Sequence, residues 1–118
     1  MRNFVDAYNK RDFTVFEAAL AADARWYAVD GEKIAVEGDG RAALVAWTRR
    51  YLLQTCTTCR SELVSVAAEG NFVTTIERAR WVNKSGDCVS QAGAAVYQLG
   101  GSRIQAVWYF PASPQVAC

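Results

Sequence analysis

The chain has 118 residues, 52% of them hydrophobic, and its 13 basic and 12 acidic residues leave a net charge of +1. This length is typical of one domain that buries its own core. No run of about 18 apolar residues is present, which argues against a membrane partner. No basic cluster is present, which argues against nucleic acid. The first residues lack an apolar signal segment, so we expect a cytoplasmic protein.

The sequence contains no histidine. This excludes Ser-His-Asp and Cys-His catalysis, together with every metal site that depends on imidazole. Acid–base chemistry would then fall to carboxylates, tyrosines, lysines or a water molecule that they hold. We expect neither a metal nor a cofactor.

The four cysteines are Cys56, Cys59, Cys88 and Cys118. The first two have the spacing of redox and zinc motifs, but a thioredoxin-like site needs that motif at the start of a helix after a strand. Here it follows a predicted helix. The other two do not form the second close pair that a four-cysteine zinc site usually has. We interpret all four as ordinary buried or loop thiols.

Helical patterns dominate the first 23 residues. Phe4, Val5 and Tyr8 recur at helical spacing, and Asp12 is a predicted N-cap before a second short run of helical pattern from Phe13. Two short helices are therefore expected here.

A small hairpin and a third helix are predicted next. The extended segments 25–29 and 33–36 are joined by Asp30-Gly31, a dipeptide favoured in tight turns. The segment 38–41 then opens a helix with a broad apolar face, which ends near Thr55.

The second half of the chain alternates extended segments with strong turn signals. The four predicted strands are 60–68, 72–82, 88–99 and 103–110. Helices followed by successive strands indicate an α+β fold with an antiparallel meander. We predict one domain over 1–112 and a C-terminal tail over 113–118.

Four short motifs resemble the nuclear transport factor 2-like superfamily, which includes SnoaL-like and ketosteroid isomerase-like proteins. They are Phe4-Val5-Asp6-Ala7-Tyr8-Asn9-Lys10-Arg11-Asp12-Phe13, Ala22-Asp23-Ala24, Gly38-Asp39-Gly40-Arg41-Ala42-Ala43-Leu44 and Arg103-Ile104-Gln105-Ala106-Val107-Trp108-Tyr109-Phe110. The resemblance implies a cone, or α+β barrel, in which a curved antiparallel sheet wraps around three helices and encloses a pocket. The same scaffold carries several enzymes and many binders, so function must be argued from the site.

Strand register decides which side chains reach this pocket. A two-residue turn at Ser85-Gly86 would place Arg78 opposite Gly93, and a three-residue turn at 100–102 would place Tyr109 beside Gly93. The inward set would then be Ile76, Arg78, Arg80, Gly93, Ala95, Tyr97, Val107 and Tyr109. A slip of one residue would instead turn Glu77, Ala79 and Trp81 inward.

The complete catalytic sets of the known family enzymes are not retained. The positions that carry the tyrosine, the base and the acid of ketosteroid isomerases correspond to Phe4, Ala28 and Ala95. None of these three can move a proton.

The arginine of the epoxide hydrolases corresponds to Arg78, within Glu77-Arg78. The aspartates beside that arginine become Arg80 and Tyr109, and the helper residues become Trp26 and Ala28. Tyr109 also stands where polyketide cyclases carry an aspartate. It is therefore open whether the chain is an enzyme.

Three residues are candidates for chemistry: Arg78, Asp30 and Tyr109. Arg78 could hold a carboxylate, phosphate or enolate oxygen, or it could lie on the outer face beside Glu62 or Glu77. Asp30 could act as a base at the pocket mouth, or simply form the turn. The predicted ligand-binding residues are Tyr8, Trp26, Trp47, Arg78, Tyr97, Val107 and Tyr109.

The leading hypothesis is a pocket for a cyclic or aromatic molecule that carries a carbonyl or anionic group. If catalytic, it would be a metal-free isomerase, lyase or hydrolase. The alternative is a protein-interaction or dimerisation module with a vestigial pocket. In both cases we expect a homodimer through the outer sheet face, where Trp81, Val96 and Trp108 would point.

Overall fold

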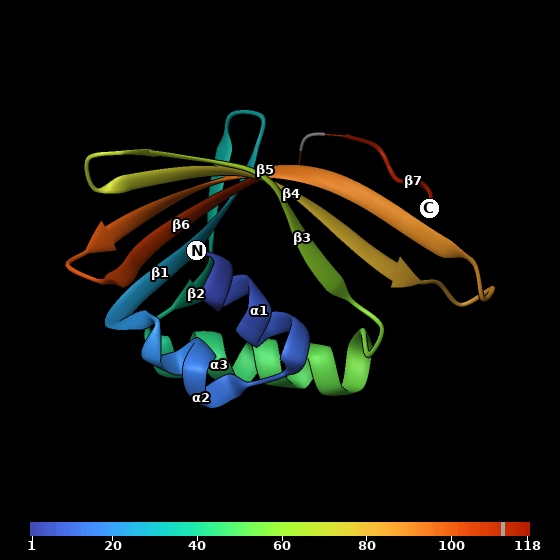
Figure 1. Cartoon of the computed structure of the whole chain (residues 1–118), viewed down its shortest axis with the longest axis horizontal. Helices are drawn as coiled ribbons and strands as arrows, with labels where there is room; N and C mark the ends of the chain where they lie inside the picture. Colours follow the sequence, from blue (N-terminus) through green and yellow to red (C-terminus); the bar gives the residue numbers. More distant parts are fainter. Residues whose placement is uncertain (112) are drawn as a thin grey trace.

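The protein is a layer of helices covered by one curved sheet (Figure 1). The structure is a computed structural model that describes residues 1–111 and 113–118. In chain order the elements are α1 (Arg2–Lys10), α2 (Phe13–Ala18), β1 (Leu20–Asp30), β2 (Lys33–Asp39), α3 (Arg41–Arg50), the π-helical turn η1 (Tyr51–Thr55), β3 (Arg60–Glu69), β4 (Phe72–Val82), β5 (Cys88–Gly100), β6 (Arg103–Pro111) and β7 (Val116–Ala117). The predicted α+β fold is confirmed, and each predicted element is present.

The two short N-terminal helices end and begin where local chemistry places them. Asp12 accepts a hydrogen bond on Oδ1 from the backbone N–H of Val15 at 3.2 Å, which confirms it as the N-cap of α2. Arg11 adopts a left-handed conformation with φ of 57°, and this residue ends α1. The sharp bend brings both helices onto the same face of the sheet.

The core lies between these helices and the middle of the sheet. Phe4 of α1 stacks on Phe16 of α2 with ring centroids 4.6 Å apart, and it meets the ring of Tyr97 edge-on. Tyr97 and Val107 are each only 1% exposed. Burial of these apolar groups stabilises the packing of helices on sheet.

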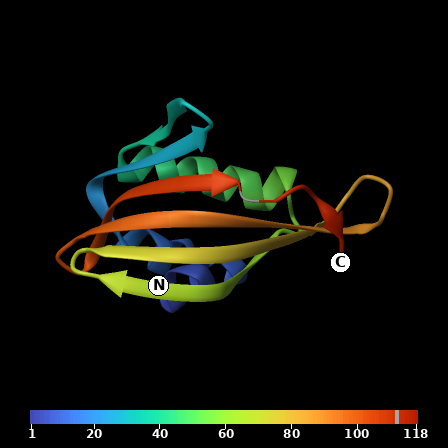
Figure 2. The ribbon, with the colours of Figure 1, turned by 90° about the horizontal axis from the view of Figure 1, so that it is seen from above.

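The sheet has the order β2-β1-β6-β5-β4-β3, with β7 attached to β5 (Figure 2). Strands β3 to β6 form the predicted antiparallel meander. β1 instead runs parallel to β6, and Trp26 lies beside Val107. This one parallel pair joins the first hairpin to the meander, which extends the curved sheet around α3.

The predicted register of β4 is wrong by one residue. The β4–β5 loop has five residues, 83–87, because the side chain of Asn83 accepts hydrogen bonds from the backbone N–H groups of Ser85 and Asp87. Glu77 is therefore the partner of Gly93, and Arg78 is the partner of Ala92. Since side chains alternate along a strand, Glu77 and Ala79 face the helices.

The inward set predicted for β5 and β6 keeps its face, although the pairing differs in detail. Tyr109 pairs with Ala95 rather than Gly93, because the turn is shorter than expected and the ladder shifts between Gln98 and Leu99. The Tyr109 ring nevertheless lies over Gly93, where an added Cβ would overlap the tyrosine hydroxyl. Gly93 thus leaves room for that ring on the concave face.

The interpretation of the cysteines as free thiols is wrong. Cys56 is bonded to Cys59, and Cys88 is bonded to Cys118. Disulfides persist mainly in oxidising compartments, so these pairs give no support to a cytoplasmic location. In the described residues, no helix has both the length and the apolar character needed to cross a membrane.

The last six residues return to the sheet. β7 pairs with β5 through Val116 and Ala117, at the end of β5 that β6 does not cover. The bond between Cys88 and Cys118 fixes this strand in place. The expected boundary of the tail at residue 112 lies outside the described residues.

Candidate functional site

A cavity of about 280 Å³ lies between the concave face of the sheet and the helices. Its wall is formed by the helices α1, α2 and α3, the turn η1 and the strands β1 to β6. The lining residues are Phe4, Val5, Tyr8, Phe16, Trp26, Glu37, Leu44, Trp47, Thr48, Tyr51, Leu52, Ser61, Glu77, Ala79, Tyr97 and Tyr109. Most of this surface is apolar or aromatic, which suits a small organic molecule.

One side of the cavity is an aromatic wall built by the third helix. Trp47 of α3 stacks on Tyr51 of η1 with ring centroids 5.1 Å apart. Trp47 is 51% exposed, so it lies where the cavity opens to solvent. The π-helical turn after α3 carries both Tyr51 and Leu52 into the wall, and such turns often occur at functional sites.

The opposite side carries a carboxylate held by two buried hydroxyls. The Thr75 hydroxyl donates a hydrogen bond to Glu77 Oε2 at 2.6 Å, and the Tyr97 hydroxyl donates to the same oxygen at 2.7 Å. Thr75 and Tyr97 are each 1% exposed, so both donors are fixed by packing. They fix the orientation of Glu77 through Oε2, and within the described residues its other oxygen, Oε1, accepts no hydrogen bond.

The tyrosines around Glu77 are held in their protonated form. Burial raises the pKa of Tyr97 well above its usual value, and the negative charge of Glu77 raises it further. Burial raises the pKa of Tyr8 to about 12, with smaller contributions from Tyr51, Tyr109 and Glu77. Burial and Glu77 also raise the pKa of Tyr109. These phenols are therefore hydrogen-bond donors at neutral pH.

This arrangement places a carboxylate oxygen and phenol donors on one wall of a mainly apolar cavity. Among the described residues, the hydroxyls of Thr75 and Tyr97 donate to Glu77 Oε2, whereas those of Tyr8 and Tyr109 make no hydrogen bond. The hydroxyls of Tyr8 and Tyr109 are therefore available to a ligand. A carboxylate can take or return a proton, and nearby phenols can stabilise the oxygen on which charge develops.

Five of the predicted ligand-binding residues line this cavity, namely Tyr8, Trp26, Trp47, Tyr97 and Tyr109. Val107 lies in the core instead, where it packs in the cluster with Phe4 and Tyr97. Whether the five bind a ligand remains a prediction that the fold makes geometrically possible.

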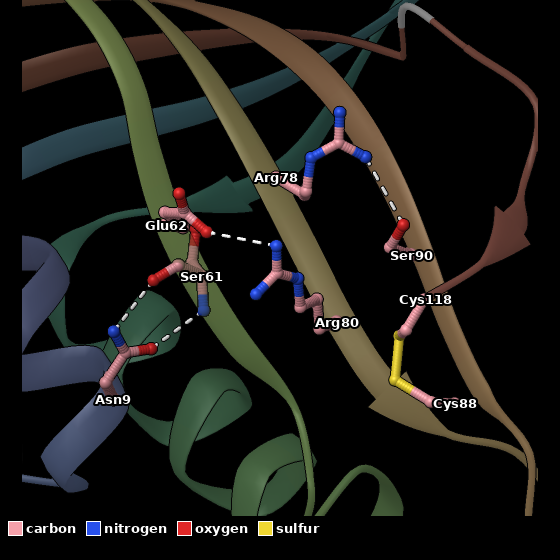
Figure 3. A network of polar contacts seen from close by, with 8 residues as sticks. All are labelled: Asn9, Ser61, Glu62, Arg78, Arg80, Cys88, Ser90 and Cys118. Atoms are coloured by element: carbon pink, nitrogen blue, oxygen red, sulfur yellow. Dashed lines mark hydrogen bonds and ion pairs between the residues drawn. A yellow bond between two sulfur atoms is a disulfide. The ribbon is translucent and has the colours of Figure 1, made fainter.

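Arg78 lies on the face of β4 opposite to Glu77 and is not among the residues that line the cavity. Figure 3 shows the Arg78 side chain extending toward Ser90 of β5. Its guanidinium donates a hydrogen bond to the hydroxyl of Ser90 at 3.3 Å. On the same face Arg80 forms an ion pair with Glu62 at 3.4 Å. Asp30 is an exposed residue at the end of β1, where it flanks the turn, and it is not part of the lining. Of the two positions predicted for Arg78, the structure has the one on the outer face. Of the two roles predicted for Asp30, its position agrees with that of a turn residue.

Glu77 is the candidate functional residue that the sequence analysis missed, because the register predicted there turns its side chain outward. The alternation of buried Val73 and Thr75 along β4, which continues to Glu77, marks the inward face once the structure is known. No set of three His, Cys, Asp or Glu side chains that could hold a metal ion occurs among residues 1–111 and 113–118.

The cone fold and its internal cavity define a class of small α+β pocket proteins. The family model of the SnoaL-like domain matches residues 1–107, so the chain belongs to the SnoaL-like family. No curated protein matches the chain.

Solved structures share this fold at low sequence identity. A candidate ketosteroid isomerase from Kribbella flavida has 17% identity and a TM-score of 0.77, with 96% of this chain and 75% of that chain covered. An NTF2-like protein of unknown function from Burkholderia pseudomallei has 19% identity and a TM-score of 0.77, with 94% and 86% covered. An epoxide hydrolase of the LEH-like kind from M. tuberculosis has 20% identity and a TM-score of 0.73, with 94% and 78% covered. Identities this low establish the fold alone.

Proposed function

We propose that the cavity binds a small cyclic or aromatic molecule with a carbonyl group, and that Glu77 transfers a proton on that molecule. The observation that supports this most is the fixed carboxylate of Glu77 on the wall of an aromatic cavity. Its Oε2 accepts a hydrogen bond from the hydroxyl of buried Tyr97 at 2.7 Å. Fixed geometry lowers the cost of reaching the reactive arrangement.

The proposed step is proton abstraction next to the carbonyl. Glu77 Oε1 takes a proton from the adjacent carbon, and the C–H electron pair moves toward the carbonyl to form an enolate. Tyr8 or Tyr109 donates a hydrogen bond to the enolate oxygen. Where a carbon–carbon double bond adjoins the deprotonated carbon, the enolate is conjugated with it, and return of the proton from Glu77 to the far carbon re-forms the carbonyl and completes an isomerisation. Where the next carbon carries a leaving group, the enolate electrons form a new C=C bond, the carbonyl re-forms and the leaving group departs with its bonding electron pair, which completes an elimination.

This proposal replaces Arg78 and Asp30 with Glu77 as the candidate catalytic group and keeps Tyr109. It also narrows the ligand. No arginine or lysine is among the lining residues of the described chain. An anionic group on the ligand would therefore meet a carboxylate without a compensating cation, and a carbonyl is the better match.

Deuterium exchange tests this proposal without knowledge of the natural substrate. A panel of cyclic ketones is incubated with the protein in D₂O, and exchange at the carbon next to the carbonyl is followed by NMR. We expect exchange above the buffer rate. We expect Glu77→Gln to lower the protein-catalysed rate about 100-fold or more, the usual contribution of a general base.

Glu62→Gln is the matched control, because Glu62 is also a strand glutamate but lies on the outer face in an ion pair with Arg80. It should keep the wild-type exchange rate. The thermal midpoint of both variants shows that they are folded. Unchanged exchange in folded Glu77→Gln would contradict the proposal.

We also propose that the chain forms a homodimer through the outer sheet face. Two apolar rows cross this face: Val96 lies beside Trp108, and Trp108 stacks on Tyr27 at 5.3 Å. Ile76 and Phe110 each lie beside Ala94 and are 36% and 37% exposed. Burial of such a patch against a second copy is favourable. Trp81 is not part of it, because it shares the face of Glu77 and Ala79.

Light scattering coupled to size exclusion tests the dimer at micromolar concentration. The wild type should have twice the mass of the chain, and Val96→Glu should be a monomer because it places a charge in the centre of the patch. Thr14→Glu, on exposed α2, is the control and should remain dimeric. A monomeric wild type would contradict this second proposal.

A further inference from the structure

The cavity contains two glutamates and no basic residue among its described lining. Glu77 comes from β4 and Glu37 from β2, so the two carboxylates stand on strands near opposite ends of the sheet order. The ion pairs in the described structure are Arg25 with Asp39 and Arg80 with Glu62, and they include neither residue. The acidic side chains of the lining thus have no cationic partner among the described residues.

One cation near the cavity is Arg11, which lies close enough to Tyr8 to lower its pKa. Its guanidinium, however, donates hydrogen bonds to the backbone oxygens of Asn9 and Thr57. It does not line the cavity. The described lining therefore offers no positive charge to the two glutamates.

Glu37 reaches the cavity because the β1–β2 ladder contains a bulge. Trp26 pairs with Gly38, whereas Tyr27 pairs with Val36, so Glu37 is the extra residue without a ladder partner. A Cβ on Gly38 would overlap the side chain of Leu44 in α3, so the bulge is packed tightly against the helix. Bulges often redirect a side chain next to a functional site.

The remaining wall is rich in aromatic rings. Tyr8, Trp26, Trp47, Tyr51, Tyr97 and Tyr109 all line the cavity. The faces of such rings attract cations at solvent-exposed sites as well as at buried ones. Aromatic rings combined with unpaired carboxylates form the chemical environment that favours an ammonium group over a neutral group of the same shape.

We propose that the ligand of this cavity carries a positively charged nitrogen, a tertiary or quaternary ammonium group, held by Glu37 and the aromatic rings near the opening. This inference rests on the proposed function and adds the substrate class to it. Glu77 and its tyrosines remain the partners of the carbonyl end. Glu37 and Trp47 are both exposed lining residues, which places the ammonium site toward the solvent side.

Three probes with the same hydroxyphenyl ring and a compact head group test the charge. They are the para-hydroxyphenyl-trimethylammonium ion, para-tert-butylphenol and para-hydroxybenzenesulfonate, which are cationic, neutral and anionic. Their dissociation constants are measured by calorimetry at one ionic strength. We expect the cation to bind at least about tenfold more tightly than the neutral probe, as cation–π attraction and one ion pair would give. We expect the sulfonate to bind more weakly than both.

Glu37→Gln should reduce the cation-to-neutral ratio to about threefold or less. Glu69→Gln makes the same charge change at an exposed residue outside the lining, and it should keep the wild-type ratio. Cation binding that survives unchanged in Glu37→Gln would overturn the assignment.

The failure of this inference is distinguishable from failure of the proposed function. If the neutral probe binds as tightly as the cation, the ammonium class is overturned, while the ketone exchange assay can still support Glu77. If none of the three probes binds, the ammonium class is also overturned, and absence of exchange on neutral ketones would then remove the proposed function as well.

Discussion

Glu77 and Arg78 are neighbours in β4, and the structure puts them in opposite environments. Glu77 faces the aromatic cavity, where buried Thr75 and Tyr97 donate hydrogen bonds to it. Arg78 faces outward and donates to Ser90 beside the ion pair of Arg80 with Glu62. Adjacent charges of opposite sign are thus separated by the thickness of one strand.

The difference shows how one face of a sheet can be reserved for chemistry. On the inner face the two residues that donate hydrogen bonds to Glu77 are almost fully buried, so the carboxylate has a defined orientation. On the outer face the ion pair is more than half exposed on both sides, and such pairs contribute little to stability. The inner face therefore holds the candidate site, and the outer face holds the candidate interface.

The largest expected effect on the free energy of unfolding concerns the disulfide between Cys88 and Cys118, which holds β7 against β5. The double variant Cys88→Ser/Cys118→Ser should lose about 3 to 4 kcal/mol of unfolding free energy, because this bond closes a long loop of the unfolded chain. Urea denaturation of the oxidised wild type and the variant measures the loss.

The second disulfide supplies the matched control. Cys56 and Cys59 are separated by 3 positions, so removal of that bond should cost only about 2 kcal/mol by the same loop argument. Equal losses of unfolding free energy in the two double variants, or wild-type stability after full reduction, would contradict the proposed stabilisation by the Cys88–Cys118 bond.

A somewhat smaller loss of unfolding free energy is expected at alkaline pH, where the buried phenol of Tyr8 on the inner face titrates. Burial raises the pKa of Tyr8 to about 12 in the folded chain, above its usual value near 10 in the unfolded chain. Between these two values the unfolded chain has released the proton and the folded chain still holds it. Stability is therefore fully present below about pH 10 and falls as the pH rises toward 12.

This decrease should amount to roughly 2 to 3 kcal/mol for Tyr8, since each unit of pKa difference corresponds to about 1.4 kcal/mol. Urea denaturation at a series of pH values measures it, and Tyr8→Phe should show a smaller decrease. If Tyr8→Phe and the wild type decrease equally, the inner wall does not bury this phenol as described.

Much of the fold could be predicted from local sequence. Turn signals such as Asp30-Gly31 and Gly100-Gly101-Ser102 have strong conformational preferences, so the strand ends beside these turns agree with the prediction to within one residue, whereas β1 begins at Leu20, five residues before its predicted start. The N-cap role of Asp12 likewise depends on residues within one turn of the helix. The parallel pairing of β1 with β6 depends on distant segments, and no local signal indicates it.

The candidate site was harder to predict because one loop determines which face of β4 turns inward. Lys84-Ser85-Gly86-Asp87 indicates a turn, but it does not state how many residues the turn contains. Asn83 adds the deciding hydrogen bonds from its side chain, and the resulting five-residue loop reverses the faces of Glu77 and Arg78. The prediction of the aromatic lining residues depends less on the length of this loop, because most of them stand on elements other than β4.

The bond between Cys88 and Cys118 and the inward position of Glu37 could not be deduced from spacing. Cys88 and Cys118 are 30 positions apart, and only the return of β7 to the end of β5 brings them together. Glu37 enters the cavity through a bulge that has no clear sequence signature beyond Gly38. Both features follow from packing of segments that are separate in the sequence.

Contacts of a bound molecule with the aromatic rings test the central claim most directly, namely that the inner face beside Glu77 is the binding site. Isotope-filtered NOE spectra of the labelled protein with para-tert-butylphenol report which rings lie near the ligand. We predict NOEs to the rings of Tyr8, Trp47 and Tyr109. NOEs confined to Tyr27 and Trp108, on the outer face, would contradict the account.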